Sequence, residues 1–410
     1  MPDISFTGLL AVAIIAVTAP LLVNLAPALR VPAVVLEIVA GIVVGPSGLG
    51  WVELDLPIQV LGLFGLAFLL FLAGLEIDVA GLRGPRLRVT GAGYLMTLAI
   101  GLAAGLVFSG AGWVDSPLLL AITLSATSLG LIVPVLKDAR RADGEVGQLT
   151  ITAASIADFA AILLLTVFFS QTATGTATKL VFIGLFALVA VAATLALSRA
   201  GMSMGLDALL TRLQDTTAEI RVRIAVLVLV AFVALAEHLG LEAILGAFLA
   251  GAILNLVDRD TATHPHFRLK LEAIGYGFLV PVFFVSSGLR FDLDALLDRP
   301  SALARVPVFL AALLLARGLP ALLYTAGVGR RPALAAALLQ ATSLPFIVTA
   351  SQLGLLLGEF SAATAGGLIA AGLLSVVVFP PIALGLLRQD VVSPDESGRS
   401  PAGVGPAMGA

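Results

Sequence analysis

The chain has 410 residues, of which 59% are hydrophobic and only 12% are charged. A soluble domain carries roughly 25% charged residues, so 23 Lys and Arg with 26 Asp and Glu could not cover a soluble protein of this size. This balance predicts an all-α polytopic membrane protein. A net charge of −3 argues against nucleic-acid binding, the absence of Cys excludes thiolate sites, and three His argue against a His-based metal centre.

Long apolar segments follow one another along the whole chain, separated by short loops. A membrane-spanning helix needs about 20 mostly apolar residues, which predicts about thirteen spans here. The predicted spans are 5–27, 32–47, 57–76, 89–110, 116–136, 147–170, 179–198, 222–238, 240–256, 271–289, 304–327, 333–357 and 362–387. The first span lacks a basic leader and a cleavage site, so we interpret it as a retained helix.

Positive charges in the loops predict the orientation of these spans. Eighteen Lys and Arg lie in alternate loops and the tail on one side, whereas the opposite loops hold only Lys179, Arg290, Arg299 and Arg305. Cytoplasmic loops are enriched in Lys and Arg. We therefore expect a multi-pass protein of the cell (inner) membrane with its N-terminus outside and its C-terminus in the cytoplasm.

The two halves of the chain resemble each other at an offset of about 210–215 residues. Ala-Thr-Ser-Leu occurs at 126–129 and again at 341–344, Ala-Gly at 40–41 and 250–251, and Gly-Leu at 74–75 and 288–289. Spans 1–6 and 8–13 are then the repeats. Because seven spans separate equivalent elements, the repeats run in opposite directions, an arrangement typical of transporters.

Both Ala-Thr-Ser-Leu segments lie in mid-span and predict broken, crossing helices. Thr and Ser side chains compete with the helix ladder, and a helix-weakening residue follows each segment. The residues of this predicted crossing are Ala126, Gly130, Thr342, Ser343 and Pro345. Ordinary kinks packed with small residues are the alternative interpretation.

Asp158 is the acidic residue nearest the middle of a predicted span. An isolated charge is costly inside the membrane, so the carboxylate is best held when a proton or a cation neutralises it. Competition between the two suffices for exchange. Ser155, Thr127 and Ser128 could add oxygen ligands for a monovalent cation, the one metal site that we predict. A structural ion pair between Asp158 and Arg317 is the alternative for the acid, and helix packing is the alternative for Ser155 and Thr127.

Two further charges lie inside predicted spans. Arg317 is in mid-span in span 11; because Arg stays protonated, it needs an acid or the carbonyl end of a broken helix as its partner. Glu37 in span 2 is nearer the cytoplasmic side. It either lines an inner vestibule or bonds to a neighbouring backbone.

Several motifs resemble the Kef- and NapA-like sodium or potassium/proton antiporters, the second monovalent cation:proton antiporter family. These motifs lie at 36–38 with 45–50, 71–78, 124–128 with 134–138, 246–251 and 283–292. The resemblance covers nearly the whole membrane part. It implies a NapA/NhaA-like fold of thirteen helices with two inverted six-helix repeats, a homodimer, and elevator-like movement of a core.

The resemblance also implies a division of the chain. The dimerisation domain would hold helices 1–3 (1–78) and 8–10 (222–292), and the core helices 4–6 (79–170) and 11–13 (293–387). Residues 171–221 would form linker helix 7 and a cytoplasmic connector. Residues 388–410 would form a disordered cytoplasmic tail.

The chain departs from the family pattern at two positions. Family members carry a polar residue before the site Asp, where this chain has Ala157, and electrogenic relatives carry a Lys where this chain has Arg317. With one titratable acid and no Lys, we expect electroneutral exchange of one cation for one proton.

The prediction is a secondary transporter, without enzymatic activity or cofactor, that exchanges Na⁺ or K⁺ for protons. The main alternative is a sodium-coupled symporter of an organic solute on the same fold, which would need an additional pocket. A second alternative is a channel or sensor that has kept the fold and lost exchange.

Overall fold

The computed structural model describes residues 6–25, 32–77, 85–169, 176–201, 219–257, 265–297 and 300–388. Three predicted features lie wholly or partly outside this part of the chain: the last residue of the motif at 71–78, the cytoplasmic connector that follows linker helix 7, and the tail at 388–410. The described residues form helices and no β-strand, apart from an isolated bridge between Val114 and Phe360.

Helices occur in each of the thirteen predicted segments. They are α1 Thr7–Leu25, α2 Ala33–Val44, α3 Leu56–Leu75, α4 Pro85–Gly110, α5 Pro117–Ser125, α6 Leu129–Asp138, α7 Glu145–Phe169, α8 Thr176–Gly201, α10 Ile220–His238, α11 Ala243–Val257, α12 Pro265–Ile274, the π-helix η2 Gly275–Leu279, α13 Val280–Leu289, α14 Leu293–Leu297, α15 Pro300–Ala321, η3 Leu322–Tyr324, α16 Thr325–Val328, α17 Arg330–Gln340, α18 Pro345–Leu356 and α19 Ala362–Arg388.

Within the described residues, six helices are long and apolar enough to cross a membrane. A seventh span results if α17 and α18, which are bent by 41° at their junction, count as one. Five further apolar helices, among them α2 and α11, are shorter. The count of thirteen spans therefore remains a prediction, whereas the all-helical membrane architecture is established.

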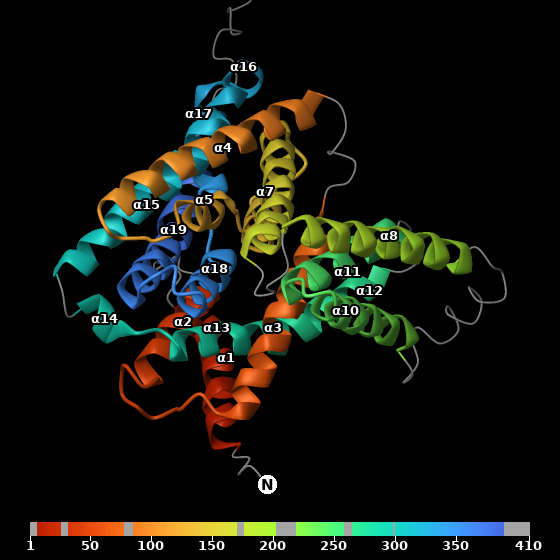
Figure 1. The fold of residues 1–410 in the computed structure, drawn as a ribbon, viewed down its shortest axis with the longest axis horizontal. Coiled ribbons are helices and arrows are strands. Elements are labelled where there is room, and N and C mark those ends of the chain that lie inside the picture. Colours follow the sequence, from red (N-terminus) through yellow and green to blue (C-terminus); the bar gives the residue numbers. More distant parts are fainter. Residues whose placement is uncertain are drawn as a thin grey trace, which may run out of the picture.

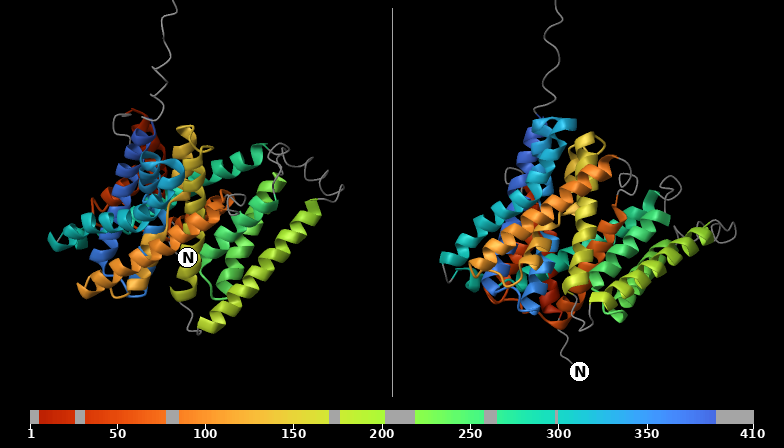
Figure 2. Two further views of the ribbon diagram at one scale, coloured as in Figure 1. Left: turned by 90° about the horizontal axis from the view of Figure 1, so that it is seen from above. Right: turned by 45° about the horizontal axis from the view of Figure 1, so that its top comes forward.

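The helices pack into two groups that meet along one face (Figure 1). One group contains α4, α5, α7, α15 and α17–α19, which pack on one another. The other contains α1–α3 and α10–α13, with α8 beside α11. In Figure 2 the green helices of the second group stand apart from the blue helices of the first, and α3, α6, α7 and α11 provide contacts between the groups.

Glycine pairs hold the second group together. Gly41 of α2 faces Gly288 of α13, and Gly74 of α3 faces Gly251 of α11, each so closely that a Cβ would collide with the opposite backbone. Small residues allow membrane helices to approach in this way, because helix association in lipid depends on close packing rather than on the hydrophobic effect. The four helices that these contacts join also contribute residues to the cavity described below.

Candidate functional site

Two interrupted helices meet at the centre of the first group. The first break, residues 126–128, separates α5 from α6, and the second break, residues 341–344, separates α17 from α18. The Ser128 N–H donates a 3.0 Å hydrogen bond to the Thr342 carbonyl, so the two breaks touch. Such non-helical backbone inside a membrane is tolerated where it is buried in protein.

Asp158 binds directly to the first break. Its carboxylate oxygens accept hydrogen bonds from the Thr127 N–H at 3.0 Å and from the Leu129 N–H at 3.2 Å. The side chain projects from α7 and is only 8% exposed. Because the N-terminus of α6 carries a partial positive charge, the backbone itself favours an anion here.

Arg317, 1% exposed, binds to the opposite side of the same break. Its Nε donates to the Thr127 hydroxyl at 2.7 Å, and that hydroxyl donates to the Gln340 carbonyl at 2.8 Å. Weaker bonds of 3.4 Å run from Nε to the Gln340 carbonyl and from Nη1 to Thr97. Arg317 thus contacts the carbonyl end of α17, where a helix favours a cation.

Thr127 lies between the two buried charges. Its N–H binds the Asp158 carboxylate, while its hydroxyl binds the Arg317 guanidinium. The charges are therefore bridged through one residue, which differs from the direct ion pair considered as an alternative. Of the two partners expected for Arg317, an acid or the carbonyl end of a broken helix, the structure has the second.

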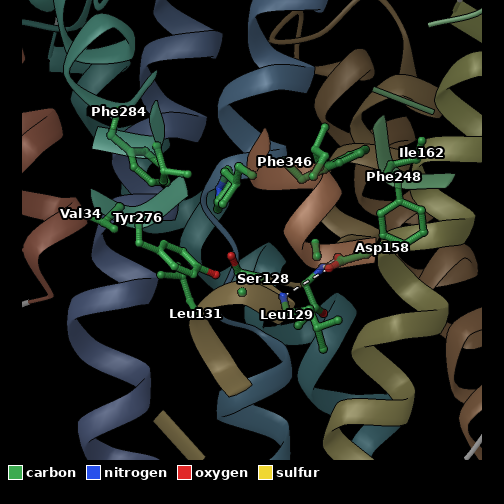
Figure 3. A pocket seen from close by; sticks show the side chains of 17 residues that line it. Val34, Ser128, Leu129, Leu131, Asp158, Ile162, Phe248, Tyr276, Phe284 and Phe346 are labelled. Carbon is green, nitrogen blue, oxygen red and sulfur yellow. Dashed lines mark hydrogen bonds between the residues drawn. The ribbon is translucent and has the colours of Figure 1, made fainter. Parts of the chain in front are cut away.

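A cavity of about 50 Å³ opens beside the Asp158 carboxylate (Figure 3). Thr127, Ser128 and Gly130 of the first crossing helix and Pro345 of the second line it, together with apolar side chains of α2, α3, α11 and α13. A water molecule occupies about 30 Å³ of liquid, whereas drug-sized ligands need roughly 300 Å³ or more. The cavity accommodates a small ion with little accompanying water.

The remaining predicted crossing residues lie at the breaks, and all of them except the half-buried Gly130 are buried. Ala126 and Thr342 have no exposed surface, and Pro345 is the first residue of α18. The Ser343 N–H donates to the Ser375 hydroxyl of α19 at 3.2 Å. Gly130 is the second residue of α6 and follows directly after the predicted break.

Ser155 and Glu37 are buried, and neither lines the cavity. Ser155 is one turn before Asp158 in α7, 2% exposed, and its hydroxyl has no hydrogen-bond partner among the described residues. Glu37 is buried in α2, and it is Val34, one turn earlier, that reaches the cavity wall. Roles in cation binding and in an inner vestibule remain predictions for these two residues.

Sequence reasoning missed three residues of the site. Thr97 and Ser375 are hydroxyl residues surrounded by apolar neighbours, and nothing in their local sequence separates them from packing residues. Tyr276, which lines the cavity from η2, does carry a signal, because it stands between Gly275 and Gly277 within a predicted span. Among the described residues, no three His, Asp or Glu side chains form a group that could hold a metal ion.

Residues 13–387 match the family model described as sodium/hydrogen exchanger, transmembrane. The chain is 30% identical over 415 residues to the putative Na⁺/H⁺ antiporter YjbQ of Bacillus subtilis, a match that covers 97% of this chain and 65% of that protein. It is 28% identical to the glutathione-regulated potassium-efflux system protein KefC of Klebsiella pneumoniae, over 69% of this chain and 45% of that one.

A solved structure has the same fold. The sodium proton antiporter MjNhaP1 from Methanocaldococcus jannaschii superposes with a TM-score of 0.60 over 95% of this chain and 99% of that chain, at 18% sequence identity. The resemblance noted in the sequence motifs therefore extends over the whole membrane part.

Proposed function

Because the chain belongs to the sodium/hydrogen exchanger family, we propose that it exchanges a monovalent cation, Na⁺ or K⁺, for protons across the membrane. The relatives named as Na⁺/H⁺ antiporters and the shared fold support cation:proton exchange. The chain spans 65% of the length of the Bacillus protein.

The observation that carries the proposal is the position of Asp158. Its carboxylate lies in a buried cavity and already accepts two backbone N–H groups, which leaves its other lone pairs for a proton or a cation. One buried carboxylate is neutralised by either species, so each displaces the other. Thr127, Ser128 and Ser155 are the neighbouring hydroxyls that would complete an oxygen shell.

Electroneutral exchange follows if Asp158 alone changes charge. Arg317 is the other buried charge at the crossing, and it is tied to Thr127, Gln340 and Thr97 rather than to the cavity. A guanidinium stays protonated, so it does not carry the transported proton. One carboxylate then moves one cation in one direction and one proton in the other.

We further propose elevator-type alternating access in a homodimer of thirteen-helix subunits in the cell (inner) membrane. The core would contain α4–α7 and α15–α19, and the dimerisation domain α1–α3 and α10–α13. The glycine contacts support inverted repeats: the sequence-matched pairs 40–41 and 250–251, and 74–75 and 288–289, supply the glycines that pack α2 on α13 and α3 on α11.

The size of the cavity limits the size of the transported species. About 50 Å³ next to Asp158 suits an inorganic ion and is several times too small for an organic solute. This observation favours antiport of ions over the sodium-coupled symport of an organic solute.

Proteoliposomes that contain a pH-sensitive dye test the proposal directly. A gradient of Na⁺, K⁺ or Li⁺ should change the internal pH with the wild-type protein and leave it unchanged with Asp158→Asn. The apparent KM for the cation should rise as the pH falls, since protons compete for Asp158, while the maximal rate stays constant. Asp294→Asn, at an exposed acid of α14, serves as the control.

Two results would overturn parts of the proposal. Cation-driven pH change retained in Asp158→Asn would remove Asp158 from the mechanism. A rate that depends on membrane potential at fixed ion gradients would exclude electroneutral exchange.

A further inference from the structure

The span at 265–289 changes its helical period at one place. Residues Gly275–Leu279 form the π-helix η2 between α12 and α13. Such single π turns insert an extra residue into an α-helix and are frequent at functional sites. Gly275 is pressed against α3, where an added Cβ would lie 2.5 Å from the Leu72 side chain and 3.0 Å from Phe68.

This packing places Tyr276 between two hollows. Tyr276 lines the Asp158 cavity, where its hydroxyl points toward Ser128 in Figure 3. A Cβ added to Gly130 would lie 3.5 Å from that hydroxyl oxygen. Tyr276 also lines a smaller cleft of about 10 Å³ at the ends of α3 and α12, together with Glu76, Glu272 and Arg268.

Three of the six residues that line the smaller cleft are charged, whereas apolar residues form most of the wall of the Asp158 cavity. The Glu76 and Glu272 carboxylates both lie within electrostatic range of the Tyr276 hydroxyl. Arg268 is turned to α11, where its Nη2 donates to the Asn255 side-chain oxygen at 2.5 Å, while Asn255 in turn donates to the Ile77 carbonyl at 2.8 Å. Two acids therefore line the same cleft as the Tyr276 side chain.

We propose that Tyr276 is the gate through which a monovalent cation passes between the Glu76–Glu272 cleft and Asp158. The proposal rests on the proposed function, because it concerns the route to the same carboxylate. The aromatic ring closes the route by its size, and the hydroxyl supplies an oxygen to a cation that has lost part of its water. Packing of the ring without any gating role is the competing explanation.

The absence of Cys in the chain makes the gate measurable without transport. A single Ser128→Cys substitution places a thiol on the wall of the Asp158 cavity. Its reaction with Ag⁺, a thiol-reactive monovalent cation small enough for the cavity, added to either side of oriented vesicles, reports access to the cavity. The substitution is combined with Tyr276, Tyr276→Phe, Tyr276→Ala and Tyr276→Ser, the last serving as a second truncation if Tyr276→Ala does not fold.

Removal of the ring should open the route from one side only. With Tyr276→Ala or Tyr276→Ser, labelling from the side that holds Glu76 should be about tenfold faster, and from the other side unchanged. Tyr276→Phe, which keeps the ring, should label at the rate of the unsubstituted tyrosine. A thiol at Val376, on a separate cavity of about 150 Å³ that Tyr276 does not line, should react equally in every background.

The acidic cleft is tested by the charge of the reagent. Glu272→Gln should slow labelling of the Ser128→Cys thiol by Ag⁺ several-fold and leave labelling by a neutral reagent unchanged. A structural effect on the cavity would slow both reagents alike.

Equal labelling in the truncated and unsubstituted proteins would overturn the gate, as would Tyr276→Phe reacting as fast as Tyr276→Ala. These outcomes are independent of transport. If labelling follows Tyr276 but Asp158→Asn still exchanges ions, the proposed function fails and the gate stands; if Asp158 is essential but labelling ignores Tyr276, the gate alone fails.

Discussion

At each of the two breaks a backbone N–H group donates to a side chain, but the accepting side chains differ in charge. At the first break the Thr127 N–H donates to the Asp158 carboxylate, 31 residues further along the chain. At the second break the Ser343 N–H donates to the Ser375 hydroxyl, 32 residues further along. Both acceptors project from the long helix that follows the broken one, α7 in one case and α19 in the other.

The difference concerns charge rather than architecture. Either acceptor satisfies an N–H group that the interrupted helix leaves without an internal partner. Only the carboxylate, however, can release a proton and attract a cation. Under the proposed function, the second crossing helix completes the geometry of the crossing, while the first would bind the transported ions.

The strongest test makes the first break resemble the second. Asp158→Ser keeps an oxygen acceptor for the backbone and removes the titratable charge, so cation-driven pH change should fall to the level of protein-free liposomes. The reciprocal control, Ser375→Ala, removes a neutral hydrogen bond of about 1 kcal/mol and should keep exchange within about threefold of wild type. Equal losses in the two variants would show that the carboxylate acts only as a helix cap.

The next largest effect should come from Arg317, which donates to Thr127 in the first break and to the Gln340 carbonyl, where the second break begins. Arg317→Gln removes the cation from the carbonyl end of α17 and leaves buried polar groups without a hydrogen-bond partner. The expected loss of folding free energy is about 1–3 kcal/mol. We expect a clear drop in the temperature of unfolding in detergent. Arg317→Lys should recover only part of it, because an ammonium lacks the planar fork that reaches Thr127 and Thr97 together.

Arg305 of the same helix provides the control for this measurement. It is only partly buried and binds Thr364 near the loops, away from both breaks. Arg305→Gln should lower the unfolding temperature less than Arg317→Gln does. Equal stability of Arg317→Gln and wild type would mean that the bridge through Thr127 contributes nothing measurable.

The contrast between the breaks also marks the limit of what the sequence could predict. Both Ala-Thr-Ser-Leu segments and Asp158 stand out as polar groups in apolar spans, since hydropathy and helix-breaking chemistry are local properties. The partner of Arg317 could be narrowed only to two classes, because the choice depends on which carbonyl the fold brings within reach. The carboxylate–hydroxyl correspondence between Asp158 and Ser375 escaped prediction, since a lone Ser in α19 looks like any small packing residue.

The sequence did not predict the position of Tyr276 at the site, for a different reason. Its orientation depends on the π turn at 275–279, and a hydrophobic pattern with a period of 3.6 residues carries no sign of one inserted residue. The pair of glycines around it was visible, but glycine is also frequent in ordinary membrane helices. Only the packing of Gly275 on α3 shows that these glycines accompany a π turn rather than an ordinary membrane helix.

A smaller effect should separate the threonines of the two breaks. The Thr127 hydroxyl links Arg317 to Gln340, whereas the Thr342 hydroxyl donates only to Leu338 of its own helix, at 3.1 Å. Thr127→Val should therefore cost about 1 kcal/mol more than Thr342→Val in unfolding measurements. Thr127→Ser, which keeps the hydroxyl, should behave as wild type; equal costs for the two valine variants would contradict the bridging role.

The smallest effect distinguishes two buried hydroxyls that have no hydrogen-bond partner among the described residues. Ser155 is one turn from Asp158 in α7, and Ser351 lies in α18 beyond the second break. A buried hydroxyl without a partner is a cost to folding, so neither Ser155→Ala nor Ser351→Ala should lower the unfolding temperature. If Ser155 is a cation ligand, its alanine variant alone should raise the apparent KM for the cation several-fold in the liposome assay. An unchanged KM in Ser155→Ala would mean that only Asp158, Thr127 and Ser128 bind the cation. A KM raised equally in Ser351→Ala would show that the assay responds to general packing rather than to the difference between the two breaks.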